Sequence, residues 1–185
     1  MVVKKQVLTN GKIILRPFKL QDAKLLYKAI SESMDELIPW LQFCHPDYSI
    51  EETRLWLSSR DEDWKAGKSY DFAIIDAESG SFLGGCGLNQ VNDEYKMANL
   101  GYWVRTVRTG RGIATTVVLL LAEFGFKELK LNRIEIIVDV ANKRSQRVAE
   151  KTGAVREGVL RNRLIIRDQV RDVVLFSLIP KDISG

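Results

Sequence analysis

Two glycines stand two residues apart in the segment VRTGRGIAT, residues 107–115, with Arg108 and Arg111 beside them. The apolar run TVVLLLAEFGF follows at once and predicts a buried helix that begins near Gly112. The N-terminus of a helix leaves backbone N–H groups free, and small residues let a phosphate approach them. The segment lacks the G-K-[ST] ending of a P-loop and the third glycine of G-x-G-x-x-G. It therefore indicates a phosphate-binding loop of another type, or a tight turn that needs glycine for its backbone angles.

The composition favours a single folded domain that works in a reducing cytoplasm. The chain has 185 residues, 45% of them hydrophobic, which is enough to bury a sizeable core. We expect no membrane-spanning helix, because no run of 18 apolar residues occurs, and no secretion signal. Cys44 and Cys86 are too few, and too poorly placed, for a disulfide framework or a zinc site.

Charge is distributed unevenly along the chain. Residues 1–100 carry 12 basic and 15 acidic side chains, whereas residues 101–185 carry 16 basic and 9 acidic ones. The basic half contains the glycine segment and suggests an anionic partner, either nucleic acid or a polyphosphate cofactor. A solvated basic surface is the alternative.

Hydrophobic periodicity predicts the elements that position the glycine segment. Strands are expected over 12–18, 69–76, 82–91, 96–105, 133–140, 154–166 and 171–179, and helices over 20–34, 49–66, 112–128 and 141–153. Ser49 and Glu52 have the spacing of a capping box, while Asn142 and Gly153 are placed to begin and end the last helix. Residues 37–48 predict a loop or a short helical turn. A mostly antiparallel meander with one β-α-β-α-β section makes the fold class α+β.

Four segments in order resemble the GNAT acetyltransferases: GYWV, GRGIAT, LNRIEIIVDVANKRSQRVAEKTGA and EGVLRN. The resemblance is closest to the branch that contains the RimJ/RimL ribosomal-protein N-terminal acetyltransferases. It covers residues 8–180 and implies one GNAT domain, with a central mixed, mostly antiparallel sheet of about seven strands and about four helices.

The resemblance implies acetyl-CoA as the co-substrate, with no metal. The family signature Q/R-x-x-G-x-G/A falls on residues 109–114, where Thr109 replaces the first Gln or Arg and Arg108 offers a charge one residue earlier. The diphosphate is expected on the N–H groups of residues 109–115, and the pantetheine arm beside the strand end at residues 103–105. The implied binding residues are Trp103, Val104, Arg105, Arg108, Thr109, Gly110, Arg111, Gly112, Ile113, Ala114, Thr115 and Asn142.

Transfer of acetyl to an amine requires a base, a stabilised oxyanion and a protonated thiol. Glu157 shares strand parity with Val155 and Val159, so an apolar environment is expected to raise its pKa and make it the base. The resemblance supports this role, but Gly158 could mark a bulge that reverses the parity, and an exposed or arginine-paired glutamate is the alternative. Ser145, in a first helical turn, is the candidate proton donor to the thiolate, with capping as the alternative. The resemblance places the oxyanion on a backbone N–H near Val104.

Several other polar and aromatic residues have less specific expectations. His45 is expected to be exposed or to line the substrate site rather than to act in catalysis. Trp40, Phe43 and Tyr48 are equally suited to an acceptor pocket and to the core. Asp139 follows the outward parity of its strand and is expected to be an ordinary polar residue.

The sequence thus predicts an acetyl-CoA-dependent N-acetyltransferase whose acceptor is the N-terminal α-amine of a ribosomal or other cytosolic protein. Acetylation of a small amine, such as a polyamine, an amino acid or an aminoglycoside, is the alternative. A non-catalytic CoA-sensing or RNA- and ribosome-binding module is the alternative of another class. The chain lacks the stacking aromatics of an RNA-binding motif, so direct binding of nucleic acid is not expected. The resemblance also allows a homodimer.

Overall fold

Alternating apolar residues build a mixed sheet of eight strands in the computed structural model, which describes residues 3–183. The strands are β1 (Leu8–Thr9), β2 (Ile13–Pro17), β3 (Tyr70–Asp76), β4 (Phe82–Asn92), β5 (Met97–Val104), β6 (Arg133–Asp139), β7 (Val155–Ile166) and β8 (Gln169–Leu178). The α-helices are α1 (Ala23–Ser31), α2 (Met34–Leu37), α3 (Ile50–Ser58), α4 (Arg60–Lys65), α5 (Ile113–Lys127) and α6 (Lys143–Lys151). The α+β class is confirmed.

The expected elements are all present, with two additions and one expected helix divided in two. The two-residue strand β1 pairs with β2, and the short helix α2 follows α1. The helix expected over 49–66 divides at Ser59 into α3 and α4. The capping box of α3 is confirmed: Glu52 N donates to Ser49 Oγ at 3.2 Å, and Ser49 N donates to Glu52 Oε1 at 3.0 Å.

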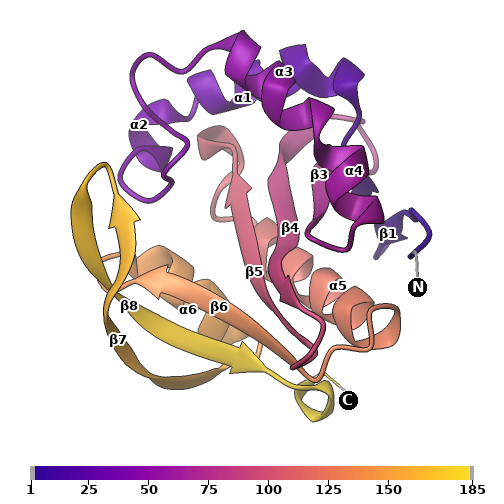
Figure 1. The fold of residues 1–185 in the computed structure, drawn as a ribbon. Helices are drawn as coiled ribbons and strands as arrows, with labels where there is room; N and C mark the ends of the chain where they lie inside the picture. Colours follow the sequence, from indigo (N-terminus) through magenta and orange to yellow (C-terminus); the bar gives the residue numbers. More distant parts are fainter. Residues whose placement is uncertain (1–2, 184–185) are drawn as a thin grey trace.

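The sheet opens between β5 and β6. Its order is β1-β2-β3-β4-β5-β6-β8-β7, and all neighbours are antiparallel except β5 and β6. These two pair in parallel only from Met97 opposite Arg133 to Asn99 opposite Glu135, and they diverge beyond that point (Figure 1). The divergence leaves one edge of β5 without a strand partner, because the other edge of β5 pairs with β4.

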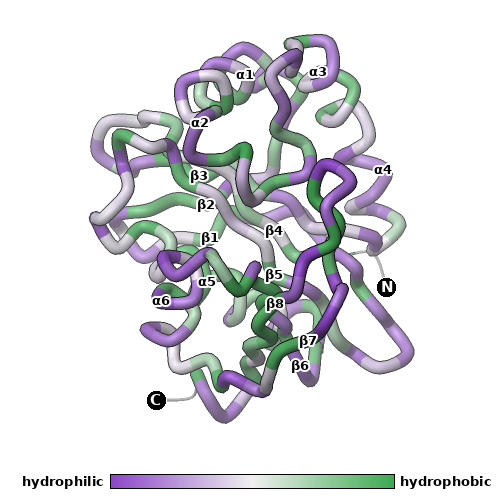
Figure 2. The backbone as a smooth tube through the Cα atoms, turned by 90° about the vertical axis from the view of Figure 1, so that its left-hand side faces the viewer, coloured by the Kyte–Doolittle hydropathy of each residue, from purple (hydrophilic) through white to green (hydrophobic). Residues whose placement is uncertain are grey.

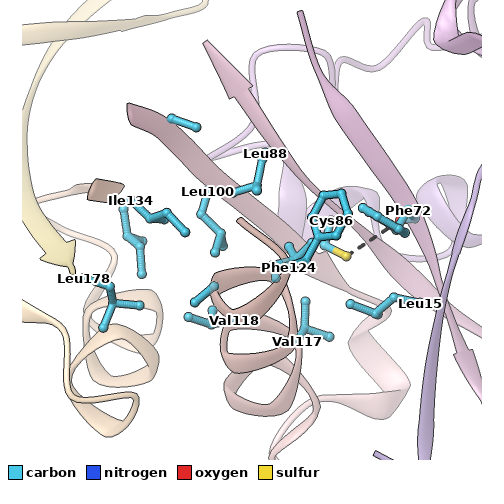
Figure 3. Packing of buried hydrophobic residues seen from close by; sticks show 14 of the residues in the cluster. Leu15, Phe72, Cys86, Leu88, Leu100, Val117, Val118, Phe124, Ile134 and Leu178 are labelled. Atoms are coloured by element: carbon cyan, nitrogen blue, oxygen red, sulfur yellow. Dashed lines mark hydrogen bonds between the residues drawn. The ribbon is translucent and has the colours of Figure 1, made fainter. Parts of the chain in front are cut away.

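Helix α5 packs across one face of the sheet and forms the centre of the main core (Figure 3). Val117, Val118 and Leu121 are fully buried, and the ring centroids of Phe124 and Phe72 lie 5.5 Å apart. Each such side chain contributes about 1.5–3 kcal/mol of burial free energy. The expectation of a helix that is buried almost all round is confirmed, apart from a stripe of exposed residues that includes Leu119, which is 41% exposed.

A second apolar cluster lies on the opposite face of β3 and β4, where α1 and α3 cover the sheet. Ala73 of β3 and Phe82 of β4 meet Leu26 of α1 and Leu57 of α3 in this cluster. In Figure 2 the hydrophobic colour follows the strands and α5, whereas α6 is mainly hydrophilic. Within residues 3–183, no helix is long and apolar enough to cross a membrane.

Candidate active site

A cleft of about 1450 Å³ follows the divergence of β5 and β6. Its walls come from the free edge of β5, the end of β6, the loop into α5, the start of α6 and the region from α1 to α3. Three hydrogen bonds link α6 and the β7–β8 turn to residues 36–42 on the opposite wall of the cleft. The side chain of Arg144 on α6 donates to Glu36 of α2 at 3.0 Å, and Arg167 of the β7–β8 turn donates through its backbone N–H to Gln42 at 2.9 Å and through its guanidinium to Ile38 O at 2.5 Å.

The glycine segment lies at one end of this cleft, at the N-terminus of α5. Gly112 is the N-cap of α5 with φ of 76°, and Gly110 has φ of 75°, so both adopt the left-handed conformation that favours glycine. A Cβ at either position would meet no atom within 4 Å, so the space beside the loop is open. The N–H groups of the first turn of α5 have no partner within the helix, which makes this end of the cleft suited to an anion.

The two arginines of the segment differ in position. Arg108 lines the cleft together with Gly110, Gly112 and the residues from Ile113 to Thr115, whereas Arg111 does not. Thr109 lines the cleft, but its hydroxyl donates to the carbonyl of Thr106 at 2.9 Å, so it completes the turn before α5.

The free edge of β5 contributes Trp103 and Val104 to the cleft, as the sequence suggested. Arg105 is placed differently. Its guanidinium pairs with Glu32, the residue after α1, and donates to Phe82 O at 3.3 Å. Its side chain is therefore not part of the cleft wall. Arg105 N donates to Leu83 O at 2.8 Å and continues the pairing with β4.

Ser145 and Asn142 meet the cleft at the start of α6. Asn142 caps the helix as expected, because its Oδ1 accepts from Ser145 N at 3.0 Å. The Oγ of Ser145 is hydrogen-bonded to the hydroxyl of Tyr102 at 2.8 Å, and the same hydroxyl donates to Ser145 O at 3.2 Å. Burial raises the pKa of Tyr102 to about 12, so its hydroxyl stays protonated at neutral pH. Sequence reasoning missed Tyr102, although it lies in the GYWV segment.

Glu157 lies outside the cleft, on an exposed part of β7. The register between β7 and β8 shifts at this residue, between Arg156 and Gly158, which is the bulge that the glycine suggested. Arg133 donates to its two oxygens at 2.7 and 2.6 Å, and Ser177 Oγ donates at 2.6 Å. The hydrogen bonds from Arg133, followed by the one from Ser177, lower the pKa of Glu157 to about 2. The expected apolar environment and raised pKa are therefore wrong, and an ion-paired carboxylate of this kind is a poor base at neutral pH.

Asp139 also differs from expectation, because it is buried rather than an ordinary surface residue. Its Oδ1 accepts from Ala141 N at 2.7 Å and shapes the turn between β6 and α6. Sequence reasoning also missed the basic side chains of α6. Lys143, Arg144, Arg147 and Lys151 all line the cleft. Their helix was visible in the sequence, but the direction of its basic face was not.

The other end of the cleft is aromatic and acidic. Trp40, Phe43 and Tyr48 all line it, and His45 joins them. His45 Nε2 and Glu52 Oε2 lie 2.8 Å apart. All three aromatic residues therefore belong to the cleft wall, and Tyr48 also packs against the second apolar cluster, so both interpretations hold for it.

Comparison with known proteins places this architecture in a family. The sequence model of the acetyltransferase (GNAT) domain matches residues 12–155. N-acetyltransferase p20 of Bacillus licheniformis, named as uncharacterized, is 28% identical over 180 residues, which cover 97% of this chain and 99% of that protein. The [ribosomal protein uS5]-alanine N-acetyltransferase of Escherichia coli (strain K12) is 26% identical over 186 residues, which cover 97% of this chain and 94% of that protein. The solved structure of Mycobacterium smegmatis RimJ in complex with CoA-disulfide superposes with a TM-score of 0.87 at 25% identity, over 99% of this chain and 89% of that one. With the splayed β5 and β6 strands and the glycine turn at α5, these matches lead to one conclusion: the chain belongs to the GNAT acetyltransferase family.

Proposed function

We propose that this protein transfers the acetyl group of acetyl-CoA to the N-terminal α-amine of a ribosomal or other cytosolic protein. The observation that carries this proposal is a single cleft with ends of opposite charge. The end at α5 and α6 has the glycine turn with Arg108 and the basic side chains of Lys143, Arg147 and Lys151, and the end at α2 and α3 has Glu52 and the aromatic residues. Glu36 and Arg144 pair with each other across the cleft. A polyphosphate donor suits the first end, and a cationic amine suits the second.

The residues of the donor end fit CoA in three respects. The open turn at Gly110 and Gly112, the free N–H groups of α5 and the cation of Arg108 suit a diphosphate. The unpaired edge of β5 at Trp103 and Val104 suits an arm that contains amides, because an extended chain binds a strand edge through main-chain hydrogen bonds. The RimJ structure was solved with a CoA derivative, which supports the same ligand here.

The protein groups around the reacting atoms have distinct tasks. An α-amine has a pKa of about 8, so only a minor fraction is neutral at pH 7 and deprotonation must accompany attack. A backbone N–H of the β5 edge near Val104 stabilises the developing oxyanion. Ser145, held in place by Tyr102, supplies a proton to the departing sulfur and recovers one from the amine nitrogen through solvent.

The size of the cleft favours an extended acceptor. Single small-molecule sites usually occupy about 300–1,000 Å³. A cleft of about 1450 Å³ exceeds this range and accommodates CoA with the first residues of a peptide. The name of the E. coli relative, an alanine N-acetyltransferase of a ribosomal protein, supports the same class of acceptor.

A panel of acceptors tests this proposal. Peptides with free N-termini, the same peptides with blocked N-termini and an internal lysine, and small amines including spermidine are incubated with acetyl-CoA. Thiol release and peptide mass are then recorded. Acetylation that requires the free N-terminus is expected. Transfer to small amines alone would show that the acceptor is a small amine rather than a protein N-terminus. Binding of acetyl-CoA without any transfer would indicate a non-catalytic CoA-binding protein.

A further inference from the structure

Two paired glycines, Gly87 of β4 and Gly101 of β5, line the cleft where it crosses these strands, and we call this pair the glycine floor. Gly87 of β4 is paired with Gly101 of β5 on one side and with Asp71 of β3 on the other. A Cβ at Gly87 would lie only 2.5 Å from Asp71 Oδ1, so the carboxylate of Asp71 extends over Gly87 and occupies the space of its missing side chain. Asp71, Gly87 and Gly101 all line the cleft.

The two oxygens of Asp71 have different environments. Oδ2 accepts from Arg60 at 2.6 Å and from Ser69 Oγ at 2.7 Å. Oδ1 accepts no hydrogen bond from any of residues 3–183, although the side chain is only 15% exposed. Arg60 also pairs with Asp63 at 2.6 Å, so its charge is divided between two carboxylates. One rigidly held aspartate oxygen therefore faces the cleft without a donor.

A second polar atom in the same floor also has no partner. Asn99 of β5 donates through Nδ2 to Asn89 Oδ1 at 3.0 Å, which orients its own Oδ1. That Oδ1 is buried and has no hydrogen-bond partner among the described residues. Asn99 and Asn89 both line the cleft, and Asn99 lies two residues before Gly101 on the same face of β5. Asn99 Oδ1 thus lies near the glycine floor without a donor, but its burial closes it to a ligand in the cleft, which leaves Asp71 Oδ1 as the accessible acceptor.

We propose that Asp71 receives the ammonium group of the acceptor over the glycine floor and is the base that removes its proton. This inference rests on the proposed function, and it assigns the base to a residue other than Glu157. An α-ammonium carries three N–H donors, of which one matches Asp71 Oδ1 and the others remain for water or the peptide. The glycines matter because any side chain at Gly87 would collide with the carboxylate.

The electrostatic environment of Asp71 is compatible with this role. Burial raises the pKa of Asp71, against the opposing effects of the hydrogen bond from Ser69 and the charge of Arg60. The charge of Asp63 on α4 also raises the pKa of Asp71. The thiol of Cys86 on β4 is a further titratable group that interacts with Asp71. A carboxylate with a raised pKa accepts a proton near neutrality more readily than an exposed one.

The proton balance of the step is simple. Asp71 takes one proton from the ammonium, and the lone pair that remains on nitrogen forms the C–N bond with the acetyl carbon. The C–S bond breaks with its electron pair on sulfur, which takes a proton from Ser145. The nitrogen loses a second proton that restores Ser145 through solvent, and Asp71 releases its proton to water. Ammonium and thioester thereby give amide, thiol and one proton.

The test compares Asp71→Asn with wild type on the acceptor identified by the panel above. We expect kcat/KM for the acceptor to fall about 100-fold, as for loss of a general base, and the acidic limb of its pH profile to disappear. The affinity for acetyl-CoA should stay close to wild type, whereas the melting temperature should fall because Arg60 keeps only Asp63 as a charged partner. Asp93→Asn, at an exposed turn, is the matched control and should leave the rate unchanged. Asp71→Glu keeps the charge, and the acidic limb should move with the new carboxylate.

The outcomes separate this inference from the proposed function. Suppose that wild type acetylates peptides, and that Asp71→Asn has a kcat/KM within threefold of wild type and an unchanged pH profile. This result would overturn the role of Asp71 and leave the proposed function standing. If wild type acetylates small amines only, the acceptor class is wrong, and the same comparison on that amine still decides the role of Asp71. If Asp71→Asn does not fold, the pH profile of Asp71→Glu decides. An acidic limb at the same pH as in wild type would overturn the inference.

Discussion

The hydroxyl of Tyr102 and the Oγ of Ser145 lie 2.8 Å apart and join β5 to the first turn of α6. This bond holds a serine hydroxyl at the point where β5 and β6 have separated. Tyr102 belongs to the strand that supplies the binding edge, so the position of Ser145 is tied to the position of that edge.

Removal of the two hydroxyls tests this arrangement. Ser145→Ala should lower kcat by about 100-fold, because the thiolate loses its proton donor. Tyr102→Phe removes the hydrogen bonds of its hydroxyl to Ser145 Oγ and Ser145 O, and loss of the bond to Oγ, worth about 1 kcal/mol, should lower kcat about fivefold. In the double variant, Tyr102→Phe should have no further effect, because its partner is absent. Single-turnover rates measure all three, and additive effects would show that the two residues act independently.

Gly112→Ala should destabilise the turn before α5. The left-handed conformation costs an alanine about 1–2 kcal/mol, while the open space around the site adds no clash. The melting temperature should fall by roughly 2–8 °C, and acetyl-CoA binding should weaken with it. Gly158→Ala is the control, since its Cβ would also meet no atom within 4 Å and no positive φ applies there. Equal effects of the two substitutions would argue against strain at Gly112.

Arg108 and Arg111 form a matched pair for acetyl-CoA binding. Arg108 lines the cleft and Arg111 does not, although only two residues separate them. Arg108→Ala should weaken binding by about 1–2 kcal/mol, which is about five- to thirty-fold in Kd. Arg111→Ala should change the Kd less than twofold. Calorimetry at low and high salt measures both, and the difference should shrink as salt screens the charge. A larger loss at Arg111 would place the phosphates on the other side of the turn.

Glu157→Gln should affect stability and leave transfer nearly unchanged. The folded-state pKa of about 2 is below the unfolded value of 4.5, so the pair with Arg133 stabilises the protein fully above pH 4.5. That contribution disappears as the pH falls from 4.5 through about 2. Because the side chain of Glu157 is 35% exposed, the contribution at neutral pH should be at most about 1 kcal/mol. Unfolding of wild type and variant by urea across this pH range measures it. A large loss of kcat at neutral pH would instead return Glu157 to the catalytic residues.

The sequence alone predicted the elements because local rules govern them. The capping pair Ser49 and Glu52, the N-cap Asn142 and the apolar α5 depend on neighbours within a few residues. The glycine turn was visible for the same reason, since residues 110 and 112 need backbone angles that few other residues adopt. Four motifs in order then sufficed to identify the family.

The tertiary structure decided which side chains meet in the cleft. The parity of a strand assigns a face only while its register is unbroken, and the bulge at Glu157 placed that carboxylate beside Arg133. Asp71 could not be recognised from the sequence, because its place over Gly87 depends on the pairing of strands that are separated by a hairpin. Long-range pairing and side-chain direction determine such contacts, and neither is encoded in a short stretch of sequence.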